Sequence, residues 1–176
     1  MFRRPQKEPP REELFDVDLE HGTVQRKGDG IRVMAVSSLG WASLEKELAS
    51  TFTSGAAVIL QRMGYSYGRY LGRLSKAKGQ TPDQAFEVMQ SFSTESGWGQ
   101  MRLNGGDLNK GDARIVVKGC FFCANRAEGT EPVCNMLAGV VGGLADEILG
   151  VTHRVVELKC LAKGDSVCEI TVERVG

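Results

Sequence analysis

Three cysteines and one glutamate in the last quarter of the chain have the residue types and spacing of a metal site. Cys134 stands in the first turn of a predicted helix, and Glu157, Cys160 and Cys168 belong to a predicted β-hairpin. Thiolate sulfur and carboxylate oxygen bind zinc, and four such donors close a tetrahedral site. The helix dipole favours a thiolate at Cys134, and a hairpin returns Cys168 beside Cys160. The alternative interpretation is a set of buried, inert thiols and a surface glutamate.

The spacing of Glu157 and Cys160 puts one condition on this site. Residues three apart point to opposite faces of a regular strand. Both side chains reach one ion only if the strand ends or bulges near Leu158. The metal-site interpretation therefore predicts an irregular strand at that residue.

Two further cysteines stand in the segment Gly119-Cys120-Phe121-Phe122-Cys123, at the end of a predicted strand. On a strand they face opposite sides, which argues against joint binding of one ion. A redox pair of the thioredoxin type opens a helix, and none is predicted here. We interpret Cys120 and Cys123 as buried thiols that line the core or a pocket. A second metal site, or an extra ligand that completes an iron or zinc site with Cys134, is the alternative.

The sequence contains no pattern of a catalytic site. It has no Gly-x-Gly-x-x-Gly segment that opens a helix after a strand, no Walker loop and no His-Glu-x-x-His. A cysteine nucleophile needs a base, and His153 is the one candidate near the cysteines. We expect His153 instead to be a polar residue on an exposed strand face. No catalytic residue is predicted, and the chain is not expected to be an enzyme.

The elements that position these residues follow from apolar spacing and turn residues. Apolar residues recur at three- and four-residue spacing in four segments, and Thr81-Pro82-Asp83 is a strong helix start. The predicted helices cover residues 39 to about 52, about 55 to 77, 82 to before 97, and 133–149. The predicted strands are 22–25, 31–36, one after residue 100, 114–123, 151–159 and 167–173. This order indicates an α+β fold with an antiparallel sheet packed against helices.

A row of glycines marks the second predicted helix. Gly64, Gly68 and Gly72 follow one another at four-residue spacing, so they share one helix face. Each costs up to about 1 kcal/mol relative to alanine, so a close contact must offset that cost. Tight packing against another helix of the domain is the favoured interpretation. A ligand or a dimer partner in the groove is the alternative.

Composition limits the partners and the compartment. The 176 residues include 22 Lys and Arg and 22 Asp and Glu, so no net charge attracts nucleic acid or an anionic membrane. No segment approaches the roughly 20 apolar residues of a membrane span, and the first residues do not form a secretion signal. The five cysteines are therefore expected to be thiols or metal ligands in the cytoplasm. Residues 1–13 are predicted to form a flexible arm, and residues 14–176 a single domain.

Four segments carry a family resemblance. They are Gly64-x-x-x-Gly68-Arg69-x-x-Gly72, Glu131-Pro132-Val133-Cys134-x-x-Leu137-Ala138-Gly139, Glu157-x-x-Cys160 and Gly164-Asp165-x-x-Cys168. From about Gly64 to the end, the chain resembles the vinyl-4-reductase domain. This small-molecule-binding module occurs in a bacteriochlorophyll-biosynthesis accessory protein and as the sensor of phenol- and xylene-responsive activators. The resemblance implies a zinc ion bound by Cys134, Glu157, Cys160 and Cys168. It also implies the fold of haem nitric-oxide sensors and transport-particle subunits, which commonly dimerises.

The resemblance is incomplete at the ligand pocket. The aromatic sensors hold the phenol hydroxyl with a histidine and a tryptophan. This chain has only His21 and His153, and neither stands at the position of that histidine. A pocket of small and aliphatic groups suits a larger or more apolar ligand than phenol. The residues that we expect to line it are Phe92, Trp98, Phe122, Ala138 and Val155.

These observations predict a cytoplasmic small-molecule-binding domain, a sensor or carrier, with a structural zinc site. Its ligand is expected to be a hydrocarbon, an aromatic or a tetrapyrrole-like molecule, and the domain is expected to be a homodimer. One alternative is an accessory or catalytic subunit in the 4-vinyl reduction of (bacterio)chlorophyll. Another is a scaffold subunit that binds a second protein in the groove of Gly64, Gly68 and Gly72.

Overall fold

The computed structural model describes residues 15–27, 30–126, 129 and 131–175. The predicted arm of residues 1–13 and the turn residues 28–29 lie outside this part of the chain. The chain divides into two compact units, Met1–Val36 and Ser37–Gly176, and we describe each by itself. The division falls inside the predicted single domain of residues 14–176, so that domain boundary stays a prediction.

The first unit contains a small antiparallel sheet. Its strands are β1 (Phe15–Asp18), β2 (Thr23–Arg26) and β3 (Arg32–Val33), in the order β1-β2-β3. The pairing of Val24 with Val33 confirms the predicted hairpin. β1 is an addition to that hairpin, and its residues alternate between apolar and acidic, as in a strand with two different faces.

The second unit is built on a four-stranded antiparallel sheet. Its strands are β4 (Gln100–Asp107), β5 (Asp112–Lys118), β6 (His153–Lys159) and β7 (Cys168–Arg174), in the order β4-β5-β7-β6. Short 3-10 turns follow three of them: η1 (Leu108–Lys110), η2 (Phe121–Cys123) and η3 (Leu161–Lys163). Apolar side chains of β5 and β7 supply much of the core, among them Ile115, Val117 and Ile170. The fold class is thus α+β, as predicted.

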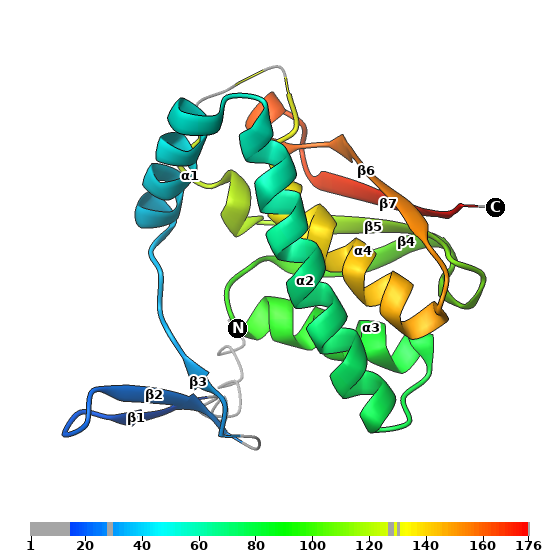
Figure 1. Ribbon diagram of the computed structural model, residues 1–176, viewed down its shortest axis with the longest axis horizontal. Coiled ribbons are helices and arrows are strands. Elements are labelled where there is room, and N and C mark those ends of the chain that lie inside the picture. The colour runs from blue at the N-terminus through cyan, green and yellow to red at the C-terminus, as the bar shows by residue number, and fades with distance from the viewer. Residues whose placement is uncertain (1–14, 28–29, 127–128, 130, 176) are drawn as a thin grey trace, which may run out of the picture. The chain divides into compact units, whose positions relative to one another are not determined.

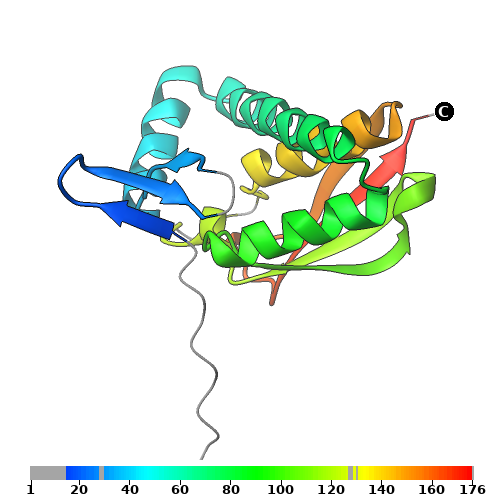
Figure 2. The same cartoon turned by 90° about the horizontal axis from the view of Figure 1, so that it is seen from below.

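The described part of this unit also contains four helices. They are α1 (Ser38–Phe52), α2 (Gly55–Ala77), α3 (Pro82–Glu95) and α4 (Asn135–Leu149). α4 packs against β6 and β7 on one side and against α2 on the other, so it lies between α2 and the sheet (Figures 1 and 2). α3 packs beside α4 and β4. In the described part of the chain, no helix has both the length and the apolar character to cross a membrane.

Helix ends occur where the local signals place them, within two residues. The Thr81 hydroxyl accepts a hydrogen bond from the Gln84 amide at 3.3 Å, and the Gln84 side chain accepts one from the Thr81 amide at 3.0 Å, which completes a capping box. Gly150 ends α4 in the left-handed conformation, with φ of 71°. α4 begins at Asn135 and not at the predicted residue 133, because Cys134 has non-helical dihedral angles and forms the cap.

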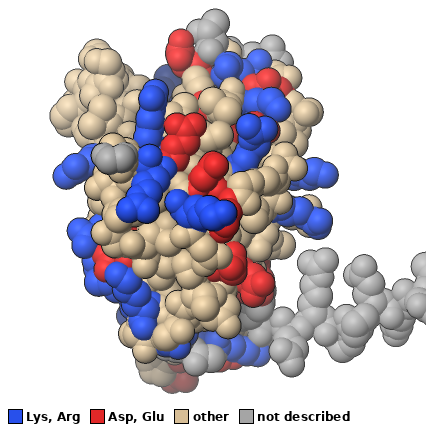
Figure 3. Space-filling model, turned by 90° about the vertical axis from the view of Figure 1, so that its right-hand side faces the viewer, with Lys and Arg blue, Asp and Glu red and all other residues tan. Residues whose placement is uncertain are grey.

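Charged side chains of both signs are interspersed on the face shown in Figure 3. Opposite charges also pair in the structure: the Glu147 carboxylate of α4 lies 2.8 Å from the guanidinium of Arg69 and 3.8 Å from that of Arg73. This mixture agrees with the equal numbers of basic and acidic residues in the sequence. The face shown therefore carries no extended area of one charge.

The predicted glycine row is the contact surface between α2 and α4. A Cβ atom at Gly64 or Gly68 would collide with a backbone carbonyl oxygen of α4, that of Met136 or of Val140. The relation is mutual, since a Cβ atom at Gly139 of α4 would collide with the backbone of α2. The interpretation as tight packing within the domain is therefore confirmed. Because α4 fills the groove, the groove is not open to a ligand or to a second protein.

Replacing Gly68 by alanine should destabilise the protein, although alanine is the better helix former. The added methyl group meets the Val140 carbonyl oxygen, and overpacking of this kind costs about 1–3 kcal/mol. Gly55→Ala is the matched control, because a Cβ atom there meets only the Phe52 Cβ at 3.7 Å, an ordinary contact. Urea denaturation measures both. Equal stability of the two variants would contradict the backbone contact.

Candidate metal centre

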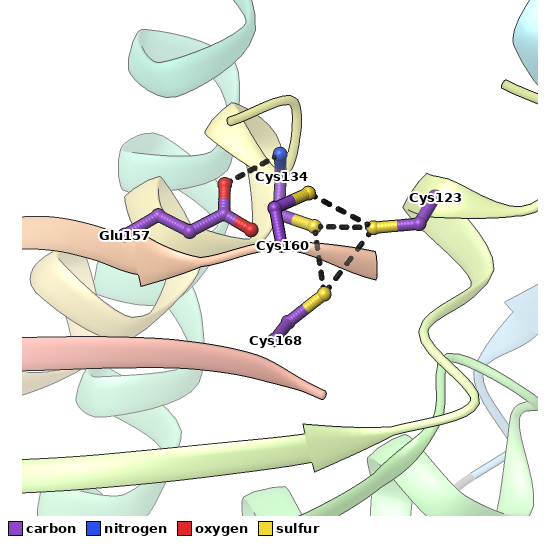
Figure 4. Close-up of side chains that lie close together, drawn as sticks. All are labelled: Cys123, Cys134, Glu157, Cys160 and Cys168. Carbon is purple, nitrogen blue, oxygen red and sulfur yellow. Dashed lines mark hydrogen bonds between the residues drawn. The ribbon is translucent and has the colours of Figure 1, made fainter. Parts of the chain in front are cut away.

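Five possible metal ligands meet at one end of the sheet. They are the four predicted residues, Cys134, Glu157, Cys160 and Cys168, together with Cys123, and their ligand atoms all lie within 4.8 Å of one another (Figure 4). Each comes from a different local feature: the end of η2, the cap of α4, β6, the residue before η3, and the start of β7. The fold thus gathers donors that are up to 45 residues apart in sequence.

The β6–β7 pairing contains the irregularity that the metal-site interpretation requires. Glu157 pairs with Ile170 and Lys159 pairs with Glu169, so Leu158 is an extra residue on its strand. Such a bulge turns the following residues relative to the preceding ones. Glu157 and Cys160 consequently reach the same cluster, and the predicted bulge near Leu158 is confirmed.

A tight turn after Cys160 directs backbone groups toward the sulfurs. The Cys160 carbonyl oxygen accepts the Lys163 amide at 2.9 Å, and the Asp165 carboxylate accepts the Cys160 amide at 2.8 Å. The next amide, that of Leu161, donates to the Cys168 sulfur at 3.4 Å. The turn therefore holds Cys160 in place and gives the Cys168 sulfur one backbone amide donor.

Cys123 reaches the cluster because its segment is not a strand. β5 ends at Lys118, Gly119 adopts a left-handed φ of 60°, and the chain then forms the 3-10 turn η2. The predicted strand of residues 114–123 is therefore too long, and the opposite-face argument against Cys123 fails. Gly119 is the signal that sequence reasoning missed, since glycine readily adopts this conformation. Cys120 and Cys123 are both buried, as predicted.

The sulfur atoms lie on the scale of a tetrahedral thiolate site. Cys123 Sγ is 3.0 Å from Cys134 Sγ, 3.4 Å from Cys160 Sγ and 3.2 Å from Cys168 Sγ, and Cys134 Sγ is 3.6 Å from Cys168 Sγ. Zinc–sulfur bonds of about 2.3 Å place the sulfurs of a tetrahedron about 3.8 Å apart. All four distances are somewhat shorter than this, so a small outward movement of the side chains would accommodate the ion.

Glu157 has one oxygen engaged and one without a partner. Its Oε2 accepts a hydrogen bond from the Cys134 amide at 2.9 Å, so the carboxylate holds the beginning of α4. Its Oε1 is buried and forms no hydrogen bond. A buried oxygen in this state costs about 1–3 kcal/mol, and a cation next to it would remove that cost. The residues therefore fit a thiolate-binding metal ion such as zinc.

The electrostatics of the cluster also point to a cation. Burial raises the pKa of the Glu157 carboxyl above its ordinary value. The contacts between sulfurs raise the pKa of some thiols and lower that of others. The hydrogen bond with Cys120 raises the pKa of Cys134, whereas the hydrogen bond with Cys134 lowers the pKa of Cys160. One thiolate is thus stabilised at the expense of its neighbour. Full ionisation of the cluster requires a positive charge, which a divalent metal ion would provide.

The prediction that His153 lies on an exposed strand face is wrong. Its side chain is fully buried, with Nδ1 2.8 Å from the carboxylate of Asp146, whose other oxygen accepts the Tyr65 hydroxyl at 2.8 Å. Gly111 allows this burial, because a Cβ atom there would collide with the imidazole. His153 begins β6, whereas Glu157 and Cys160 lie at or beyond its other end. It therefore does not pair with the cysteine cluster as a catalytic base.

The predicted pocket residues fall into two groups. Phe92, Trp98 and Phe122 belong to an aromatic cluster, in which the Trp98 ring lies 5.4 Å from Phe92 and 5.5 Å from Phe122, both edge to face. Ala138 is buried on α4, and Val155 of β6 packs against α4 at Gly142. The proposed role of these residues in binding a ligand stays a prediction.

A separate apolar cavity lies between α3, α4 and the sheet. Its volume is about 40 Å³, and all of its lining residues are apolar, including Phe86, Met89, Ala113, Leu144 and Ile148. None of the five predicted pocket residues lines it. The fold thus contains an apolar space at a place that the sequence analysis did not identify.

The chain is similar to proteins from an archaeon. It is 28% identical to uncharacterized protein MJ0745 of Methanocaldococcus jannaschii over 128 residues, which cover 73% of this chain and 59% of the relative. Uncharacterized protein MJ0150 of the same organism is 24% identical over 109 residues, 62% of each chain. The chain thus spans about three fifths of the length of these two relatives.

Solved structures share the fold. The phenol-responsive sensory domain of the transcription activator PoxR aligns with a TM-score of 0.75, at 20% identity over 92% of this chain and 85% of that chain. A vinyl-4-reductase family protein from Methanocaldococcus jannaschii aligns with a TM-score of 0.59, at 18% identity over 82% and 85%.

Two more distant structures confirm the predicted fold relationship. Trafficking protein particle complex subunit 3 from Naegleria fowleri, covalently bound to palmitic acid, has a TM-score of 0.56 and 16% identity over 79% of this chain and 93% of that one. An H-NOX protein from S. oneidensis has a TM-score of 0.55 and 11% identity over 86% and 84%. Residues 113–174, which contain all five donors of the cluster, match the model of the V4R domain. Together with the shared fold, this match confirms the predicted resemblance to the vinyl-4-reductase (V4R) domain over residues 113–174.

Proposed function

We propose that this chain binds a small apolar molecule, as a sensor or carrier, and that a structural zinc ion stabilises its binding domain. The observation that carries the proposal is the cavity between α3, α4 and the sheet, which is lined by apolar residues alone. The similarity in fold to a phenol-responsive sensory domain over 92% of the chain supports it. So does the similarity to a subunit whose structure contains palmitic acid.

The lining and size of the cavity restrict the ligand. It offers no hydrogen-bonding side chain, which favours a hydrocarbon over a phenol, because a phenol hydroxyl would be buried without a partner. Its 40 Å³ compares with about 150 Å³ for a cavity that binds benzene, so a ligand must displace part of the wall. Met89 is suited to such movement because its side chain is unbranched and flexible. A tetrapyrrole is far too large for this space.

The proposed zinc ion acts as a cross-link. The thiolates of Cys134, Cys160 and Cys168 hold it, with Glu157 as the fourth ligand predicted from the sequence. These residues come from α4 and the β6–β7 hairpin, so the ion ties the helix to the edge of the sheet. A site closed by four protein donors leaves no position for a substrate, which is the arrangement of structural zinc.

The proposal includes a cytoplasmic location and a homodimer. Five buried cysteines that form no disulfide with one another are consistent with a reducing compartment. Exposed apolar side chains on α1 and α2 support self-association: Leu44 is 63% exposed, Phe52 51%, Val58 59% and Met63 51%.

Sedimentation equilibrium of the purified protein measures its mass in solution. We expect the mass of a dimer, and a monomer at micromolar concentration would argue against the dimer.

Replacing Cys160 by serine should remove the metal and lower stability. A bound ion present at 100 to 1,000 times its dissociation constant stabilises a fold by about 3–4 kcal/mol, which corresponds to about 6–16 °C in melting temperature for a protein of this size. Cys120→Ser is the control, since Cys120 is also buried but is not one of the five donors. Metal analysis and calorimetry measure both variants. A Cys160→Ser protein with unchanged melting temperature and metal content would refute the site.

Binding of toluene or cyclohexane should raise the melting temperature, and phenol should raise it less. Ala85→Val places two methyl groups at the cavity wall and should abolish the shift, because the space is already small. Ala138→Val is the matched control, a similar change at a buried residue outside the cavity. Each variant is compared with its own ligand-free melting temperature. If Ala138→Val abolishes the shift and Ala85→Val does not, the ligand occupies the pocket predicted from the sequence instead.

A further inference from the structure

The cluster has five donors, whereas a tetrahedral ion takes four. Three of the donors, Cys134, Cys160 and Cys168, form a triangle of sulfur atoms. Figure 4 shows this triangle nearly edge-on, with Cys123 directed at it from one side and the Glu157 carboxylate at it from the other. Either Cys123 or Glu157 would complete a tetrahedron with the same three thiolates. Cys123 and Glu157 cannot both bind the ion at once, because an ion bound by Cys123 lies on one side of the sulfur triangle and an ion bound by Glu157 lies on the other.

We propose that Cys123 is the fourth ligand of the zinc ion and that Glu157 is the reserve ligand on the opposite side. This inference rests on the proposed zinc site and departs from the ligand set predicted from the sequence. Cys123 Sγ contacts every sulfur of the triangle, at 3.0 Å, 3.4 Å and 3.2 Å, as the apex of a tetrahedron must. Cys120 lacks this arrangement, since it is not among the five residues whose ligand atoms all lie within 4.8 Å of one another, although its sulfur is 3.4 Å from that of Cys134.

The environment of Glu157 fits a reserve ligand. Its Oε2 is already bonded to the Cys134 amide, which anchors the carboxylate at the start of α4. Its Oε1 faces the cluster without a hydrogen-bond partner, so it is able to take the ion if Cys123 withdraws. If the ion moved through the triangle, Glu157 would replace Cys123 as its fourth ligand while the three shared thiolates stay bound.

Binding through Cys123 connects the ion to the aromatic cluster. Cys123 directly follows Phe122, whose ring lies 5.6 Å from that of Trp41 and 5.5 Å from that of Trp98. Trp41 belongs to α1, so the fourth thiolate extends the cross-link from α4 and the hairpin to η2 and, through these rings, to α1. The protein has only these two tryptophans, which makes their fluorescence a reporter of this connection.

X-ray absorption at the zinc edge of the full-length, zinc-loaded protein tests the assignment. We expect four sulfur neighbours at about 2.3 Å and no oxygen at about 2.0–2.2 Å. Cys123→Ala should keep one zinc per chain but show three sulfurs and one oxygen. Glu157→Gln and the control Cys120→Ala should both keep four sulfurs. Removal of zinc by a chelator should change the tryptophan emission of the unmodified protein at least twofold more than that of Cys123→Ala.

The outcomes separate this inference from the proposed function. Three sulfurs and one oxygen in the unmodified protein would overturn the role of Cys123 and leave the structural zinc site intact. An unchanged sulfur count in Cys123→Ala, or loss of zinc in Glu157→Gln, would overturn it as well. A protein that binds no zinc would refute the zinc site and this inference together. If Cys123→Ala does not fold, the spectra of the unmodified protein and of Glu157→Gln decide the question.

Discussion

The backbone contact between α2 and α4 is the constraint on which the second unit depends. Glycines on both helices, such as Gly68 and Gly143, remove the side chains that would keep the two backbones apart. α4 is therefore held between α2 and the sheet, and it is buried without interruption from Leu137 to Leu144. Glycine in a helix costs up to about 1 kcal/mol per residue, which the close packing of two helices must offset. This position of α4 also places Cys134 beside the end of the β6–β7 hairpin.

Small local irregularities of the backbone direct the candidate metal ligands toward a common point. The bulge at Leu158 turns Glu157 and Cys160 toward one point, and the turn after Cys160 brings the Leu161 amide to the Cys168 sulfur. The 3-10 turn η2 directs Cys123 toward the cluster. The bulge was predicted from the spacing of Glu157 and Cys160, whereas η2 replaces the end of the predicted strand 114–123. Regular strands alternate their side chains between two faces, so a compact cluster at the end of a sheet needs such departures. A metal ion would then offset the cost of several buried, partly charged groups in contact.

The cavity and the metal centre make different contributions to the proposed function. The cavity lies between α3, α4 and the sheet, and its wall is apolar throughout. The metal centre lies at the start of α4, where its donors come from four other segments. One helix thus contributes to both, since Val141 and Leu144 line the cavity a few residues after Cys134. An ion that fixes the beginning of α4 would therefore also steady one wall of the cavity.

The sequence by itself determined the α+β class, most helices, the glycine contact, the resemblance to the V4R domain, and the meeting of Cys134, Glu157, Cys160 and Cys168 at a strand bulge. These features depend on local spacing, caps and residue size, which the chain carries wherever it folds. Only the tertiary structure decided that Cys123 joins the cluster, that His153 is buried beside Asp146, and where the apolar cavity lies. Each of these depends on which distant segments meet. The periodicity of one segment contains no information about the partner that packs against it.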